Sequence, residues 1–148
     1  MDRTPTIHAS AVLVGARALL IRGPSGSGKS RLALALIDAA RGGPLAFARL
    51  VADDRAHVEA SHGRLLVRPA PALAGLIEVR GLGIMRLPYE PVAAVGLVVD
   101  LAADAERLPP AGAGTTVVEG IELSRLAVAA GADALPIVLA ALTMEPAR

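Results

Sequence analysis

Residues 23–30 read Gly23-Pro-Ser-Gly-Ser-Gly-Lys-Ser30 and fit the pattern G-x-x-x-x-G-K-[ST] at every fixed position. Glycines at these positions let backbone N–H groups converge on an anion without obstruction by Cβ atoms. In such a loop the lysine ammonium reaches the outer phosphates of a nucleotide, and the last hydroxyl can join the shell of a Mg²⁺ ion. The motif therefore predicts a phosphate-binding loop at the start of a helix, where the helix dipole also favours an anion.

The sequence on both sides of the loop fits this prediction. Two apolar runs, residues 11–14 and 18–21, flank a glycine-bearing turn and predict a β-hairpin whose second strand leads into the loop. Residues 30–40 are rich in alanine and leucine and predict a helix, which ends near Arg41-Gly-Gly-Pro44. This strand–loop–helix context distinguishes the motif from a glycine-rich turn that matches by accident.

The basic residues give a second reason to assign a function to the loop. Lys29 is the single lysine among 15 basic residues, and the other 14 are arginines. A compositional preference for arginine explains the fourteen but not the exception. A compact ammonium suits a phosphate loop better than a broad guanidinium fork does, so the exception supports a role for Lys29.

Composition and charge limit the class of protein. The 148 residues are 53% apolar, include two aromatic residues and carry a formal net charge of +1. They predict a single α/β domain over residues 1–148 with an aliphatic core. The balanced charge and the shortage of stacking aromatics argue against nucleic-acid binding. With no cysteine, no secretory signal and no membrane-spanning apolar run, the chain is expected to be cytoplasmic and free of membranes.

The remainder of the chain is expected to consist mainly of strands joined by turns. We expect a strand at 50–54, a hairpin from 56–60 and 64–68, a short helix or turn at 70–77, strands at 91–101 and 115–118, a break at 108–114 and a terminal helix at 135–144.

Two acids end the apolar run Leu50-Val-Ala-Asp-Asp54. Phosphoryl transfer needs a carboxylate near Mg²⁺, and transfer to an alcohol benefits from a carboxylate that accepts the hydroxyl proton. Neighbouring side chains on a strand point to opposite faces, so Asp53 and Asp54 could divide these two tasks. A solvated turn at the strand end is the alternative, because aspartate is also favoured in turns.

A third segment reads Ile77-Glu-Val-Arg-Gly-Leu-Gly-Ile-Met85. Taken alone, its two glycines are a weak signal and are typical of a strand with a kink.

Together these segments resemble the catalytic domain of the HPr kinase/phosphorylase family, which phosphorylates a serine of HPr, a phosphocarrier of the bacterial phosphotransferase system. The resemblance rests on the phosphate loop, on residues 50–54 and 77–84, and on His8 ahead of the loop, and it covers about residues 6–88. It implies the P-loop-containing, phosphoenolpyruvate-carboxykinase-like fold, a mixed sheet with flanking helices. It also implies a short form that holds only the kinase domain, ATP and Mg²⁺ as cofactors, an HPr-like substrate protein and assembly into hexamers.

The resemblance implies roles for individual residues as well. Asp53 would accept the proton of the incoming serine, His8 would bias the protonation of Asp53, and Lys29 would hold the β- and γ-phosphates. The metal would be held by Ser30, Asp54 and Glu78. The nucleotide would contact Gly23, Pro24, Ser25, Gly26, Ser27, Gly28, Lys29, Ser30 and Arg80.

One stretch departs from the family pattern. Members carry an arginine in the loop before the last helix, whereas residues 129–136 read Ala-Ala-Gly-Ala-Asp-Ala-Leu-Pro and Arg125 lies nearby. The resemblance therefore implies the kinase reaction and leaves phosphorolysis open. Two other functions stay open because function depends on the site rather than on the fold: a nucleotide-binding regulatory module without phosphotransfer, and a P-loop kinase for a small molecule.

Overall fold

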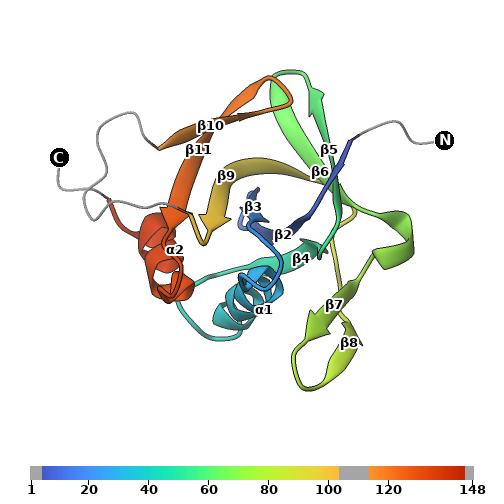
Figure 1. The fold of residues 1–148 in the computed structure, drawn as a ribbon, viewed down its shortest axis with the longest axis vertical. Helices are drawn as coiled ribbons and strands as arrows, with labels where there is room; N and C mark the ends of the chain where they lie inside the picture. The colour runs from blue at the N-terminus through green and yellow to red at the C-terminus, as the bar shows by residue number, and fades with distance from the viewer. Residues whose placement is uncertain (1–4, 104–113, 146–148) are drawn as a thin grey trace.

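The computed structural model describes residues 5–103 and 114–145, which form strands with two α-helices (Figure 1). The elements in chain order are β1 (Thr6–Ile7), β2 (Ala9–Val14), β3 (Arg17–Arg22), α1 (Lys29–Ala39), β4 (Ala48–Ala52), β5 (Ala56–Ser61), β6 (Arg64–Pro69), the 3₁₀ helix η1 (Pro71–Leu73), β7 (Leu76–Val79), β8 (Gly83–Arg86), β9 (Ala93–Leu101), β10 (Thr115–Val118), β11 (Ile121–Val128) and α2 (Ala134–Thr143).

Nine of these strands form one mixed sheet, and its topology positions the phosphate loop. The order is β1-β5-β6-β9-β3-β2-β4, and β11 with β10 branches from β9. Strands β3, β9 and β11 run parallel to one another, while β2 runs antiparallel to both β3 and β4. The carboxyl ends of β3, β4, β9 and β11 and the start of β2 therefore lie at one edge of the sheet. Ligands of α/β sheets bind outside such carboxyl ends.

The sheet curls because the long strand β9 pairs with three other strands. Its first residues pair with β6, and its later residues pair with β3 on one side and with β11 on the other. In Figure 1 the strands accordingly curve around β9, with β10–β11 on one side and β5–β6 on the other. Aliphatic side chains fill the inside of this curl, among them Leu20, Val58 and Val67, each fully buried.

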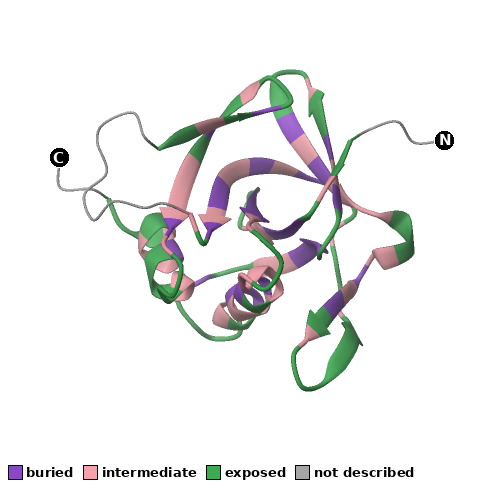
Figure 2. Ribbon diagram, viewed as in Figure 1, coloured by how far each residue is buried: buried purple, intermediate pink, exposed green. Residues whose placement is uncertain are grey.

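A second core lies between the sheet and the two helices. It includes Leu36 of α1 and Val138 of α2, which are both wholly buried. Figure 2 shows this division, with buried segments along the central strands and on the inner side of α1. Neither α1 nor α2, the α-helices of the described residues, is long and apolar enough to cross a membrane.

The local elements confirm most of the predicted ones. The hairpin before the loop, the helix after it and the terminal helix are all present, each within two residues of its expected start. The hairpin of β5 and β6 closes through His62 and Gly63, which have φ of 53° and 79°, as two-residue hairpin turns require. The predicted break at 108–114 lies outside the described residues, apart from Gly114.

The interpretation of residues 77–85 as one kinked strand is wrong. The segment is a separate two-stranded hairpin in which β7 pairs antiparallel with β8. Gly81 and Gly83 have φ of 85° and 111°, and the N–H of Leu82 donates to the carbonyl of Val79, so the chain reverses over residues 80–82 and brings Gly83 opposite Val79. Two glycines with positive φ so close together turn the chain rather than bend it, because they adopt left-handed conformations without steric cost.

Candidate active site

The phosphate loop links the end of β3, at Arg22, to the start of α1, at Lys29. Close packing restricts its first residue, since a Cβ on Gly23 would lie 2.5 Å from Ser27 Oγ and 3.1 Å from the carbonyl oxygen of Leu101. Gly28, the N-cap of α1, has φ of 100° and supplies no side-chain cap. The first N–H groups of the helix therefore have no capping side chain, which is the arrangement that binds phosphate at helix N-termini.

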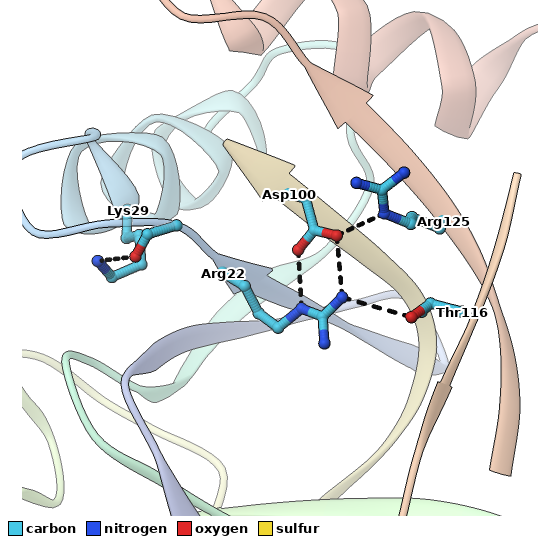
Figure 3. Close-up of polar contacts among 6 residues, drawn as sticks. Arg22, Lys29, Asp100, Thr116 and Arg125 are labelled. Carbon is cyan, nitrogen blue, oxygen red and sulfur yellow. Dashed lines mark hydrogen bonds and ion pairs between the residues drawn. The ribbon is translucent and has the colours of Figure 1, made fainter. Parts of the chain in front are cut away.

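Lys29 lies over this loop, as Figure 3 shows. Its Nζ donates to the carbonyl oxygens of Gly23, at 2.8 Å, and of Pro24, at 3.2 Å. These bonds hold the ammonium against the loop that a phosphate group would occupy. The role of Lys29 in phosphate binding stays a prediction.

Asp53 is the buried acid of the site, with 5% of its surface exposed. Its Oδ1 accepts hydrogen bonds from Ser10 Oγ at 2.7 Å and from Ser30 Oγ at 2.6 Å, and its Oδ2 accepts one from the N–H of Glu78 at 3.2 Å. The donors come from β2, α1 and β7, so three separate elements fix the carboxylate. Asp53 thereby joins the phosphate loop to the β7–β8 hairpin.

The other candidate residues lie further from this carboxylate. Asp54 is exposed, has φ of 71° and donates only its N–H, at 3.4 Å, to Ser10 Oγ. The carboxylate of Glu78 is exposed, and only its backbone N–H reaches Asp53. Arg80 is exposed in the turn of the hairpin, and His8 is exposed and makes no side-chain hydrogen bond with the described residues.

The two acids do not divide their tasks by alternating along a strand. Strand β4 ends at Ala52, so Asp53 and Asp54 both follow it, and the left-handed φ of Asp54 breaks the alternation of faces. The structure brings Ser30 together with Asp53, and it does not bring Asp54 or Glu78 into contact with Ser30 through a side chain.

The oxygens at the loop nevertheless suit Mg²⁺. Within residues 5–103 and 114–145 no three acidic or histidine side chains gather as a metal cage. Mg²⁺ seldom uses such a cage, because it keeps several waters and takes one or two protein oxygens together with phosphate oxygens. The Ser30 hydroxyl and the Asp53 carboxylate, at 2.6 Å from each other beside the phosphate loop, are oxygen ligands of this kind.

A cavity of about 720 Å³ opens beside the loop. It is lined by residues 26–28 of the loop, by Arg31, Leu32 and Ala35 of α1, and by residues 101–102 and 128–135. None of Ser10, Asp53 and Glu78 lines it. The volume is within the range that holds small-molecule ligands.

A group of charged side chains lies at the same edge of the sheet (Figure 3). Asp100 of β9 accepts two hydrogen bonds from Arg22, from Nε at 2.7 Å and Nη2 at 2.9 Å, and one from Nε of Arg125 at 2.5 Å. Arg22 also reaches Thr116 Oγ1 at 3.5 Å. Because Arg22 directly precedes Gly23, this group ties the start of the phosphate loop to β9, β10 and β11.

The surroundings of Asp100 change its acidity. Burial acts to raise the pKa of its carboxyl, but the hydrogen bonds and positive charges of Arg22 and Arg125 outweigh this, so the pKa lies below its usual value. A lowered carboxyl pKa means that the ionised form stabilises the folded state.

We expect Asp100→Asn to lower the free energy of unfolding at neutral pH by about 2 kcal/mol, between the values for exposed and fully buried pairs. The folded pKa is the lower one, so the stabilisation is complete above the ordinary aspartate pKa and is lost as pH falls through the folded pKa, below about pH 4. Urea unfolding at pH 7 and in acid measures both effects.

Asp38→Asn is the matched control for this variant, because Asp38 is 73% exposed and lies 3.8 Å from Arg41. An equal loss of stability in the two variants at pH 7 would contradict the role of Asp100.

Sequence reasoning missed Ser10 and the pairing of Arg22 with Asp100. The signal for Ser10 was present, since it is the one polar residue in the apolar strand Ala9–Val14 and it is fully buried. Buried hydroxyls need hydrogen-bond partners, so a polar partner elsewhere in the chain was to be expected. Arg125, considered only as a neighbour of the final loop, pairs with Asp100 instead.

The sequence and the structure both match known proteins. The family profile of the HPr Serine kinase C-terminal domain matches residues 1–89. The HPr kinase/phosphorylase of Clostridium tetani is 39% identical over 82 residues, which are 55% of this chain and 25% of that protein. The HPr kinase/phosphorylase of Streptococcus thermophilus (strain ATCC BAA-491 / LMD-9) is 41% identical over 85 residues, or 57% of this chain and 25% of that protein.

The match to these two relatives thus spans only about a quarter of their length, whereas a solved structure matches almost the whole chain. The HPr(Ser) kinase/phosphatase from Coxiella burnetii superposes with a TM-score of 0.71 at 25% sequence identity, over 93% of this chain and 88% of that one. This match confirms the predicted fold class, the P-loop-containing fold shared with phosphoenolpyruvate carboxykinases. With a profile match over more than half of its residues, the chain belongs to the HPr Serine kinase C-terminal domain family.

Proposed function

We propose that this protein is an ATP-dependent serine kinase whose substrate is HPr or a related phosphocarrier protein. The observation that carries the proposal is the 2.6 Å contact between Ser30 and the buried Asp53 beside the phosphate loop. This contact joins a phosphate site, a metal-binding hydroxyl and a general base, the parts that phosphoryl transfer to an alcohol needs. The relatives named above are HPr kinases, which supplies the substrate class.

The two oxygens of Asp53 have different surroundings, and this suggests how one carboxylate serves two tasks. Oδ1 accepts two hydroxyl groups, one of them from Ser30, and so faces the phosphate loop. Oδ2 accepts a single backbone N–H at 3.2 Å from the β7–β8 hairpin. Oδ2, which accepts fewer hydrogen bonds, is therefore the oxygen that would accept the proton of a serine hydroxyl, and the hairpin lies on its side of the carboxylate.

Ser30 and Asp53 would hold Mg²⁺, and the ion would neutralise charge on the β- and γ-phosphates. Lys29 and the N–H groups of the loop would bind these phosphates, with the γ-phosphate toward Asp53. The nucleoside would then lie on the opposite side of the loop, in the cavity of about 720 Å³ beside Arg31 and Leu32. Among the other candidates, Asp54, Glu78, His8 and Arg80 would act at the rim of the site.

The family resemblance also suggests the setting of the enzyme. We infer a cytoplasmic protein that assembles as a hexamer, binds neither nucleic acid nor membranes, and holds its kinase domain in residues 1–148. Light scattering coupled to size-exclusion chromatography measures the mass of the assembly directly.

The reverse reaction, phosphorolysis of phosphoserine, stays a separate question. It would need a cation to bind inorganic phosphate beside the nucleotide. The segment 129–135 lines the cavity without an arginine, and the neighbouring Arg125 donates to Asp100. We therefore propose the kinase reaction as the main activity.

One assay tests these proposals. Purified protein is incubated with radiolabelled ATP, Mg²⁺ and HPr, and inorganic phosphate is added afterwards. We expect label on a serine of HPr that inorganic phosphate removes slowly or not at all. Rapid removal would add the phosphorylase activity. Nucleotide binding without any transfer, to HPr or to small alcohols, would favour a regulatory nucleotide-binding module.

A further inference from the structure

The β7–β8 hairpin, residues Leu76–Arg86, stands apart from the body of the protein (Figure 1). It forms a two-stranded sheet of its own and exposes large apolar side chains: Leu82 is 67% exposed, Ile84 64% and Met85 38%. Contiguous exposed apolar residues of this kind mark interaction sites more often than single ones do.

The hairpin is joined directly to the candidate active site. Ile84 lies opposite Glu78 in the β7–β8 pairing, and the N–H of Glu78 donates to Oδ2 of Asp53. Ile77, on the other face of β7, is 1% exposed and anchors the hairpin in the core beneath the helices. One face of the hairpin is thus fixed to the protein by Ile77, and the other carries Ile84, which lies across the strand pair from the residue whose N–H contacts Asp53.

The charges of the hairpin define the chemistry of a partner. Arg80 and Arg86 are exposed and form no ion pair with the described residues, and Glu78 is the one acid of the hairpin. Apolar side chains accompanied by arginine are enriched in the centres of protein–protein interfaces. A complementary surface would be apolar, with carboxylates at its margin.

A protein that binds at the candidate active site would also contact the hairpin, because a protein interface is wider than the distance between the two. Specific interfaces bury about 800 Å² on each partner, a disc of about 16 Å radius. Ile84 lies directly opposite Glu78, about 5 Å away between Cα atoms, and Leu82 is two residues further along the chain, at most about 7 Å from Ile84. A protein whose serine reaches Asp53 from this side therefore covers the exposed residues of the hairpin.

We propose that the β7–β8 hairpin is the docking element for the protein substrate, and that Leu82 and Ile84 bind an apolar patch next to the acceptor serine. This inference rests on the proposed kinase function and adds the surface by which the substrate protein is recognised. A small-molecule kinase would have no use for such a surface.

The test compares the double variant Leu82→Ser/Ile84→Ser with the variant Val117→Ser. Val117 is also 64% exposed but lies on β10, at the far side of the sheet from the hairpin (Figure 1). We expect the double variant to raise the KM for HPr at least tenfold with kcat for transfer little changed, because truncated interface anchors weaken binding. Its dissociation constant for ATP stays at the wild-type value. Val117→Ser leaves all three constants unchanged.

Four other outcomes would overturn the inference. An unchanged KM in the double variant refutes docking at the hairpin while the kinase function stands. A fall in kcat alone would show that the hairpin only positions Asp53. A wild-type oligomer that dissociates in the double variant, seen by light scattering, would show that a second copy of the chain occupies the hairpin. Transfer to HPr by neither wild type nor variants would refute the proposed function itself.

Discussion

Lys29→Ala is expected to abolish phosphate transfer from ATP, with a fall in kcat of about 10³-fold or more. Removing one preorganised donor from a site of developing charge costs about 10²–10³ in kcat, and Lys29 carries a full charge in addition. Its Nζ lies 2.8 Å from the carbonyl of Gly23, so the ammonium is held against the loop that would bind the phosphates.

Two further variants make the experiment specific. Lys29→Arg keeps the charge but replaces a compact ammonium by a planar fork, and it is expected to lose most of the activity as well. Arg41→Ala removes the same charge from an exposed surface pair and is expected to leave kcat unchanged. The readouts are labelled transfer to HPr and thermal unfolding, which establishes that each variant is folded. Full activity of Lys29→Ala would refute the kinase assignment.

The phosphate loop and its context were predictable because their signals are local. The loop, the strand before it and the helix after it lie within residues 17–39, and each pattern is read without knowledge of the rest of the chain. The two-residue turn at His62 and Gly63 is local in the same sense. The expected span of the family resemblance, residues 6–88, likewise agrees with the profile match over 1–89.

The arrangement around Asp53 was not predictable in this way. Ser10 is 43 positions from Asp53 in sequence, and Arg22 is 78 from Asp100, so both contacts depend on the order and register of strands. Parallel pairing of β3 with β9 places Arg22 beside Asp100, and no short pattern encodes that register. The reversal at Gly81 and Gly83 depends on the sign of φ at two glycines, which residue identity permits but does not specify.

The contacts around Asp53 change the roles that we assign to Asp53 and Asp54. Sequence patterns suggested that Asp53 and Asp54 share the chemistry, because alternation along a strand separates their side chains. The structure fixes one carboxylate with three donors and leaves Asp54 exposed, so we propose that the two oxygens of Asp53 divide the tasks. A hypothesis about two residues thus becomes one about two atoms, and it predicts a distinct set of mutant phenotypes.

Asp53→Asn is expected to lower kcat about 10³-fold while the dissociation constant for ATP with Mg²⁺ changes less than about threefold. General-base catalysis contributes about 10²–10⁴ in rate, and an amide cannot accept the serine proton. The amide keeps the size of the side chain and one oxygen, which can remain toward Ser30. Single-turnover transfer and calorimetric titration with ATP measure the two effects separately.

Three companion variants test the roles assigned to the two carboxylate oxygens of Asp53, metal binding and proton acceptance. Ser30→Ala is expected to weaken binding of ATP with Mg²⁺ more than it slows the chemical step, because it removes the hydroxyl on the metal side. Asp54→Asn, which makes the same change at the exposed neighbour, is expected to alter kcat little if Asp53 alone accepts the proton. Asp38→Asn, on the exposed face of α1, controls for the loss of one negative charge.

The pattern across these variants separates the two roles of Asp53. A large loss of kcat with intact ATP affinity assigns proton acceptance to the carboxylate. Equal losses of kcat and of affinity in Asp53→Asn would move Asp53 to the metal and reopen the base for Asp54. Ser10→Ala removes one of the three donors that orient the carboxylate, while Ser30 still donates to Oδ1. We therefore expect an intermediate effect, a loss in kcat of about tenfold, which corresponds to about 1.4 kcal/mol.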